Sequence, residues 1–439
     1  MPPPVRAAAS PGPVVRDEAR TGSVVHHRSN SRSGIRCSSD VTFGVMNWGG
    51  PMKSRRIIAA IVLLAAAITP VSPLSAQTQP PQAPTACAPM NGLTFVCGAQ
   101  NPEDLVPIPG TRWLIASGMK EGAGLKLVDT DAKTLRVLYT GRPGQLRPDK
   151  TLFPNCPAPP DAGTFNAHGI YLRRAQAPGL YRLYVVSHGL LESIQVFAVD
   201  ANGAEPSLTW TGCVPMPEGN KAYATAAARA SSSRIAANSV AAFSDGTIIA
   251  TVPQRPGSTN TQRLRGEPTG DVVLWKPGTD SFHVVPGTQL AGNNGIEISL
   301  DEREFYVVSF GTHTVVAFSR QDPRKAVRQS QAPGFMPDNL RWSGDRLIGA
   351  GPMYDEPACG GTRLAVADNP VLTSCHRGYV IAQLDPGTMV WKTLAYAVPN
   401  PNIAVVSTGV VMGDTLWIGA ANSEGIGYQP LPGPASGAR

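Results

Sequence analysis

The feature that most constrains this chain is a short unit that recurs along it. The unit is an Asn or Asp residue, a strand of alternating side chains, a tight turn and a second strand. One copy occupies residues 291–309, and two others occupy residues 238–251 and 338–349. An Asn-Gly turn beside strands of period two is typical of a β-hairpin. A hairpin that repeats in this way indicates the inner strands of β-propeller blades.

Six such openings can be placed along the chain, near residues 103, 168, 238, 294, 338 and 407. Their uneven spacing is typical of blades that are joined by variable loops. No long apolar stretch of helical period occurs in this region, which disfavours an α/β fold. We therefore expect an all-β protein, a six-bladed β-propeller with a central metal site.

The composition agrees with a turn-rich β fold. The chain has 439 residues, with 45 Gly, 42 Pro and only 16% charged residues. The formal net charge of +7 comes mostly from residues 1–76, and the remainder is nearly neutral. No basic stripe is present, so we expect no nucleic-acid partner.

Residues 52–76 have the three parts of a signal peptide. Residues 52–56 are basic, residues 57–68 are apolar, and Leu74-Ser75-Ala76 precedes a plausible cleavage site. The apolar run is shorter than the roughly 20 residues that a membrane span requires. We expect export to the periplasm or medium after cleavage near Ala76 and no stable membrane span, with an uncleaved anchor as the alternative.

These observations divide the chain into five segments. The expected segments are a disordered or mis-annotated leader (1–51), the signal peptide (52–76), a linker (77–96), the propeller (97–430) and a flexible tail (431–439).

Six of the seven cysteines follow the leader. An even number of cysteines in an exported protein suggests disulfide bonds. Several pairings are possible, and free buried thiols are the alternative. We expect the pairing of sequence neighbours: Cys87 with Cys97, Cys156 with Cys213, and Cys359 with Cys375.

Side chains with oxygen atoms stand at several blade openings: Glu103, Asn238, Asn294, Asp338 and Asn339. Such oxygens are the ligands that a hard cation such as Ca²⁺ requires. Each residue alone also fits a turn-capping role. Their recurrence at equivalent places favours one shared metal site. Since the set has only two formal charges, a bound divalent ion would keep its Lewis acidity.

The motifs at these openings resemble those of the paraoxonase (arylesterase and lactonase) family. They are Glu103-Asp104, residues 165–170, residues 183–188, Asn238, residues 294–296 and Asp338-Asn339. The resemblance implies a six-bladed propeller that hydrolyses lactones and aryl esters with a central Ca²⁺. It makes Glu103, Asn238, Asn294, Asp338 and Asn339 the ligands of that ion.

The resemblance also implies a catalytic pair formed by His168 and His188. It places a second, structural ion at Asp104 and the Ile170 carbonyl. Ser239 stands where the family has Asp, which weakens that second site.

The implied mechanism is metal-dependent hydrolysis of a small lactone or ester. Ca²⁺ would polarise the carbonyl, and His168, hydrogen-bonded to His188, would activate water. No Gly-x-Ser-x-Gly motif occurs, which argues against a serine esterase. The four-residue Glu, Asn, Asn, Asp set is also similar to that of the gluconolactonase/regucalcin family, so a sugar lactonase is one alternative. A non-catalytic propeller that binds a partner is another.

Overall fold

A computed structural model describes residues 87–432 of the chain. The expected leader and signal peptide, the first part of the expected linker and the end of the tail lie outside the described residues. Among the helices of the described part, none is long and apolar enough to cross a membrane.

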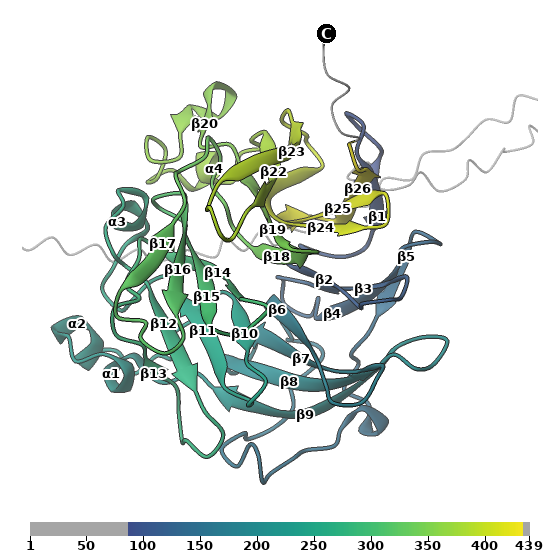
Figure 1. Cartoon of the computed structure of the whole chain (residues 1–439), viewed down its shortest axis with the longest axis vertical. Helices are drawn as coiled ribbons and strands as arrows, with labels where there is room; N and C mark the ends of the chain where they lie inside the picture. Colours follow the sequence, from purple (N-terminus) through teal and green to yellow (C-terminus); the bar gives the residue numbers. More distant parts are fainter. Residues whose placement is uncertain (1–86, 433–439) are drawn as a thin grey trace, which may run out of the picture. The chain divides into compact units, whose positions relative to one another are not determined.

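Six four-stranded sheets, arranged around a common centre, make up most of residues 87–432 (Figure 1). Neighbouring strands within each sheet run antiparallel, and a small two-stranded sheet lies apart from the six. The predicted all-β, six-bladed propeller is thus confirmed.

The inner strands of blades 1 to 6 contact one another in a closed ring. They are β2 (Leu105–Pro107), β6 (Ala167–Arg174), β10 (Val240–Ala242), β14 (Asn293–Ile298), β18 (Leu340–Ser343) and β24 (Ile403–Met412). The second strands are β3 (Trp113–Ser117), β7 (Leu180–Ser187), β11 (Ile248–Val252), β15 (Glu304–Ser309), β19 (Arg346–Pro352) and β25 (Thr415–Ser423).

The third and fourth strands lie further out in the same order. The third strands are β4 (Leu125–Asp129), β8 (Ser193–Asp200), β12 (Asp271–Trp275), β16 (Thr314–Ser319), β22 (Tyr379–Leu384) and β26 (Gly425–Pro430). The fourth strands are β5 (Thr134–Val137), β9 (Ser207–Pro215), β13 (His283–Val284), β17 (Ala326–Gln329), β23 (Trp391–Ala397) and β1 (Thr94–Cys97).

Burial of both faces explains the apolar sequences of the middle strands. Every residue of β3 and β11 is buried. Each blade packs between two neighbours, so such strands favour continuous β-branched runs like Ile248–Val252 over strict alternation.

The ring closes through hydrogen bonds between the two ends of the described chain. Strand β1 pairs with β26 in blade 6, with Thr94 opposite Tyr428 and Cys97 opposite Gly425. Because β1 belongs to a blade, the propeller begins at Thr94, inside the stretch that we expected to be linker.

Two of the three expected disulfides are confirmed, Cys156–Cys213 and Cys359–Cys375. The third is not formed, because Cys87 and Cys97 are free thiols. The two side chains hydrogen-bond, and burial, followed by this contact, raises the pKa of Cys87 to about 12.

Three excursions leave the blades at one end of the propeller. The first carries α1 (Gly219–Ala222) and α2 (Ala226–Arg229), the second α3 (Asn260–Leu264), and the third β20 (Asp355–Glu356), η3 (Pro357–Cys359), β21 (Gly361–Thr362) and α4 (Pro370–Thr373). A short η2 (Pro143–Gln145) lies between blades 1 and 2. This is the end at which the inner strands begin, since the Asn238 N–H donates to Thr251 O (2.8 Å) and the Asp338 N–H to Ala350 O (2.9 Å).

Candidate metal centre

The inner strands of blades 2 and 4 are irregular where the predicted site residues lie. The pairing of β6 with β7 shifts register between Ala167 and Ile170, and that of β14 with β15 shifts between Asn293 and Ile296. His168 lies within the first shift and Asn294 within the second. A β-bulge re-aims side chains that a regular strand would direct to one face.

A glycine after each of these residues admits the next blade. The Gly169 N–H donates to Asn238 O (3.2 Å), and the Gly295 N–H donates to Asp338 O (3.0 Å). A Cβ atom on either glycine would lie less than 3.0 Å from those carbonyl oxygens. Only glycine allows this approach, so the His-Gly and Asn-Gly pairs couple one blade opening to the next.

The predicted side chains converge although they are far apart in sequence. Asn339 Nδ2 donates to Glu103 Oε1 (2.7 Å), and Glu103 Oε2 lies 3.6 Å from His168 Nε2. Asn238 Nδ2 lies 3.4 Å from the same imidazole nitrogen. The Asn294 side chain interacts with Asp338, whose charge in turn reaches Glu103.

Several oxygens of this cluster are buried and have no hydrogen-bond partner among the described residues. They are Glu103 Oε2, Asn238 Oδ1, Asn294 Oδ1 and Asn339 Oδ1. The amides of Asn238 and Asn339 direct their nitrogens to His168 and Glu103, which leaves the amide oxygens free. Buried polar atoms in native proteins are nearly always paired, so these four oxygens suit a group that accepts lone pairs, either a cation or a hydrogen-bond donor.

The pKa values of the two carboxyls, Glu103 and Asp338, are both raised, because no nearby positive charge fully offsets their burial. Burial, then the charges of Asp104 and Asp338, raise the pKa of Glu103 well above its ordinary value. Burial raises the pKa of Asp338 to about 7. A cation placed among these oxygens would favour the charged form of both carboxyls.

The donor set fits a hard cation with oxygen ligands, such as Ca²⁺. In residues 87–432 no group of three or more His, Cys, Asp or Glu could hold a metal. An ion at this place would therefore depend on asparagine oxygens, as the sequence analysis expected. Two carboxylates and three amides suit Ca²⁺ better than a metal that prefers sulfur or imidazole.

The two predicted histidines form a pair, and a third residue extends it. His168 Nδ1 lies 2.8 Å from His188 Nε2. His188 Nδ1 lies 2.9 and 3.1 Å from the two carboxylate oxygens of Glu192. Burial, followed by the charge of His188, lowers the pKa of His168 well below its ordinary value. The neutral form of His168 is therefore favoured.

In the form in which both imidazoles are neutral, these contacts define which nitrogen of each ring carries the proton. An ionised Glu192 only accepts hydrogen bonds, so His188 Nδ1 carries a proton. His188 Nε2 is then an acceptor, and His168 Nδ1 donates to it. The lone pair of neutral His168 is thus at Nε2, on the side of Glu103 and Asn238.

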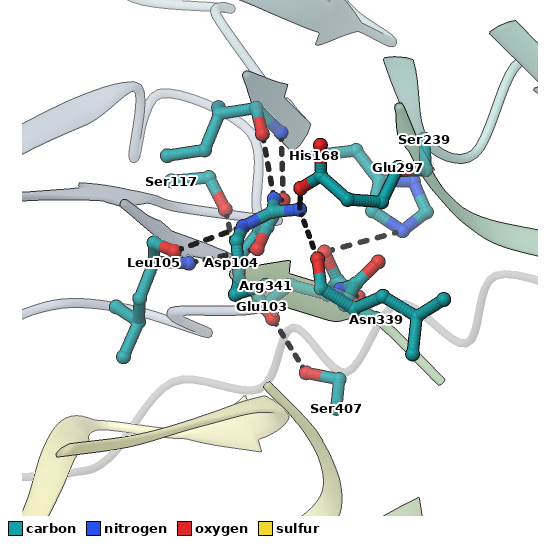
Figure 2. A network of polar contacts seen from close by, with 12 residues as sticks. Glu103, Asp104, Leu105, Ser117, His168, Ser239, Glu297, Asn339, Arg341 and Ser407 are labelled. Atoms are coloured by element: carbon teal, nitrogen blue, oxygen red, sulfur yellow. Dashed lines mark hydrogen bonds and ion pairs between the residues drawn. The ribbon is translucent and has the colours of Figure 1, made fainter. Parts of the chain in front are cut away.

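The adjacent carboxylate, Asp104, has a different environment (Figure 2). It accepts hydrogen bonds from the Leu105 N–H (2.9 Å) and the Ile170 N–H (2.8 Å), and its Oδ2 pairs with Arg341 Nη2. Arg341 is 5% exposed, and it also donates to carbonyl oxygens that include Leu105 O (3.1 Å) and Ile170 O (2.6 Å).

The Arg341 guanidinium therefore contacts the two groups, Asp104 and the Ile170 carbonyl, that were expected to hold a second ion. The second ion remains a prediction, and this arrangement does not favour it.

The sequence analysis missed Glu192 and Arg341. Glu192 follows His188 at an i, i+4 spacing, and Arg341 follows Asn339 at a two-residue spacing, so both lay beside predicted residues. Arg341 is the second residue of the inner strand β18 and lies between two apolar residues, Leu340 and Trp342. A charged residue at such a position indicates a charge near the propeller axis.

The fold and this cluster define the chain as a six-bladed β-propeller with an oxygen-rich centre. No protein-family model and no curated protein matches the sequence. Among solved structures, the chain is similar to a gluconolactonase from Xanthomonas campestris, with 16% identity and a TM-score of 0.44 over 77% of this chain and 89% of that one. It is also similar to a luciferin-regenerating enzyme, with 12% identity and a TM-score of 0.42 over 76% of this chain and 91% of that one. Likeness at this level assigns no activity to the chain.

Proposed function

We propose that this protein is an exported, Ca²⁺-dependent hydrolase of lactones or esters. The observation that carries the proposal is the set of four buried, unpartnered oxygens beside the lone pair of His168. An oxygen-ligated cation and a neutral imidazole, side by side at the centre of a propeller, suit attack of water on a carbonyl.

The proposed ligands are Glu103, Asn238, Asn294, Asp338 and Asn339. When bound, a divalent cation supplies polarisation of the substrate carbonyl and stabilisation of the developing oxyanion. The protein contributes the order of this set, because the bulge in β14 positions Asn294 and the close approaches of Gly169 and Gly295 position the backbones of Asn238 and Asp338.

His168 is the proposed general base. Its Nε2 takes a proton from the attacking water as the new C–O bond forms and the carbonyl π electrons move to oxygen, and the ester C–O bond breaks when the tetrahedral adduct collapses. His168 then returns the proton to the leaving alkoxide oxygen, so the products are the hydroxy acid, or an acid and an alcohol. Throughout, His188 accepts from His168 Nδ1, and Glu192 holds the His188 tautomer.

The proposed reaction class leaves two substrate preferences open. A paraoxonase-like enzyme would favour aryl esters and lipophilic lactones. A gluconolactonase-type enzyme would favour hydroxylated lactones. A panel of phenyl acetate, γ-butyrolactone and glucono-δ-lactone separates them by the ratio of kcat/KM values.

Export is proposed on two grounds. The first is the signal-like sequence of residues 52–76, which lie outside the described residues. The second is the formation of two disulfides in the described part. Disulfides persist in oxidising compartments. The N-terminal sequence of the mature protein should begin near Gln77.

Metal analysis and chelation test the function. Purified protein should contain Ca²⁺ and lose hydrolysis of the whole panel in excess chelator, with recovery on Ca²⁺ addition. No turnover in the presence of Ca²⁺ would favour a propeller that binds a partner instead. The His168→Gln variant should bind Ca²⁺ normally and lose at least about 100-fold in kcat, which is the usual contribution of a general base.

A further inference from the structure

Two excursions meet above the proposed metal ligands. The loop that carries α3 (residues 253–270) leaves blade 3, and the insertion between β19 and β22 (residues 353–378) leaves blade 5 at the same end of the propeller. Thr261 donates to Asp368 across them (2.7 Å). Leu264 and Phe310 form one apolar cluster with Tyr354 of the insertion. The two excursions are thus packed together.

Three arginines come from these excursions: Arg263, Arg363 and Arg377. The Arg377 side chain donates from Nη1 to Tyr354 O (3.0 Å), and the backbone N–H of Arg363 donates to the same carbonyl (3.0 Å). The Arg263 guanidinium lies over the Phe310 ring, 5.0 Å from its centroid. Phe310 and Tyr354 belong to the same cluster, so the arginines surround it.

The three arginines have buried donors that no described residue accepts. These are Arg263 Nε, Arg363 Nε, and Arg377 Nε and Nη2. Arg377 is only 2% exposed, and its remaining bonds go to carbonyls. The Thr259–Gln262 capping box fixes the start of α3, which orders the turn that carries Arg263.

The charges of these arginines are also poorly balanced. In the described chain no carboxylate lies within 4.0 Å of any of the three, as an ion pair would require. Asp338 lies near enough to influence Arg263 and Arg363, and Asp355 and Glu356 influence Arg377. Burial, then the charges of Arg377 and Arg263, lower the pKa of Arg363 to about 10.

Guanidinium groups of this kind match the planar oxygens of carboxylate or phosphate. Arg263 and Arg363 are partly exposed as residues, while their unpartnered nitrogens are buried, so an anion that binds these nitrogens leaves bulk solvent to do so. The Arg263 side chain packs against Gly292, where an added Cβ atom would collide with Arg263 Cδ, and Gly292 lies two residues before the proposed metal ligand Asn294. The cluster is therefore next to the proposed metal centre.

We propose that Arg263, Arg363 and Arg377 form a receptor for an oxyanion, carboxylate or phosphate, carried by the substrate of the metal centre. The substrate is then an anionic lactone or ester whose carbonyl lies at the metal while its anionic group lies among the arginines. This inference rests on the proposed function for the identity of the reacting group. The receptor itself is independent of that function.

Matched substrates test the inference. For carboxylate, the pair is 5-oxotetrahydrofuran-2-carboxylate and its methyl ester; for phosphate, it is 6-phosphoglucono-δ-lactone and glucono-δ-lactone. The wild-type protein should favour the charged member of at least one pair. In Arg363→Gln and Arg377→Gln this preference in kcat/KM should fall about 10- to 100-fold, mainly through KM. A control, Arg324→Gln, removes an exposed arginine that pairs with Asp322 and should leave the preference unchanged.

A binding measurement separates the receptor from the reaction. Glutarate and inorganic phosphate are titrated by calorimetry into the full chain after its metal has been removed by dialysis. Saturable binding of either probe that weakens at least about 10-fold in Arg363→Gln supports the receptor, even if no lactone is hydrolysed. Two results would overturn the receptor: turnover of neutral lactones without binding of either probe, or variants whose kcat/KM preference for the charged substrate is unchanged. Either result would indicate that ordered water pairs these donors. Arg363→Gln alters a partly exposed side chain, so the test survives if Arg377→Gln does not fold.

Discussion

Glu103 and Asp104 are adjacent in the sequence and both are buried, yet their carboxylates have opposite surroundings. Asp104 is paired with the Arg341 guanidinium and two backbone N–H groups. Glu103 has one oxygen bonded to Asn339 and the other without a partner among the described residues. The protein thus pairs one carboxylate internally, and it leaves one oxygen of the other, which we propose as a metal ligand, without a partner among the described residues. The first should matter for folding, and the second for binding and chemistry.

Removing Arg341 should produce the largest effect on stability. Arg341→Met leaves Asp104 buried without its counterion, and breaking a buried pair in this way costs about 3–5 kcal/mol. Urea unfolding of both proteins in chelator measures the loss. Arg346→Met is the matched control, because Arg346 pairs with Asp345 at the surface and such pairs contribute about 0–1 kcal/mol. A loss of unfolding free energy below about 1 kcal/mol in Arg341→Met would contradict the claim that Asp104 depends on Arg341 for its stability in the folded protein.

Replacing Glu103 should have the opposite signature. Without metal, Glu103→Gln should be at least as stable as the wild-type chain, because burial already disfavours the ionised form of Glu103 and glutamine needs no counterion. With Ca²⁺ at 100 times its dissociation constant, the wild-type chain should gain about 2.7 kcal/mol. The variant should gain little. Unfolding with and without Ca²⁺ provides both numbers.

The number of bound ions is the control for this experiment. If Arg341 takes the place of a second cation, the wild-type chain binds one Ca²⁺ and Glu103→Gln binds none or binds it weakly. Elemental analysis after gel filtration counts the ions. Two tightly bound ions in the wild-type chain would show that Asp104 has not been neutralised by the protein alone.

The metal-free chain should lose stability as the pH rises from about 4 to 7. The folded-state pKa of Asp338 is raised to about 7 from 3.8, so between these values the folded state binds more protons than the unfolded state. The stabilisation is complete below the lower value and is lost through the upper one. One such group changes the unfolding free energy by at most about 1.4 kcal/mol per pH unit.

The comparison with Asp338→Asn isolates this contribution from that of other carboxyls. The difference between wild-type and variant stability should shrink or reverse as the pH rises through this range. A difference that does not depend on pH would mean that Asp338 is ionised in the metal-free protein, contrary to its burial.

The sequence was sufficient to predict the ring and to select side chains that converge at its centre; their role as metal ligands stays a prediction. Asn-Gly and His-Gly dipeptides, followed by strands of period two, have a local cause, since turns and bulges depend on neighbouring residues. The closure of blade 6 by β1 was not predictable in this way. Thr94–Cys97 is a short strand that acquires its role only by pairing with β26, at the other end of the chain.

The contacts of Arg341 and the arginine cluster were hidden for the same reason. Arg341 bonds to residues of blades 1 and 2, so its partners depend on the closed ring. A charged residue on an inner strand is a recognisable signal, but only the fold shows what it neutralises. The Cys87–Cys97 bond was wrong for a related reason, because proximity in sequence does not fix the state of two thiols.

The smallest expected effect concerns Glu192. Its carboxylate contacts His188, which contacts His168, and the Nε2 atom of His168 lies beside Glu103. Glu192→Gln weakens the hold on His188 Nδ1–H and lets the His188 tautomer exchange. We expect kcat to fall about 10-fold with little change in KM, at the low end of losses for such supporting partners. Nitrogen-15 NMR should show His168 protonated mainly at Nδ1 in the wild-type chain and a mixture of tautomers in the variant. Glu205→Gln, which removes an exposed partner of Arg136, is the control. If the tautomers stay fixed while kcat falls, Glu192 acts through structure alone, and the relay from Glu192 to His168 has to be abandoned.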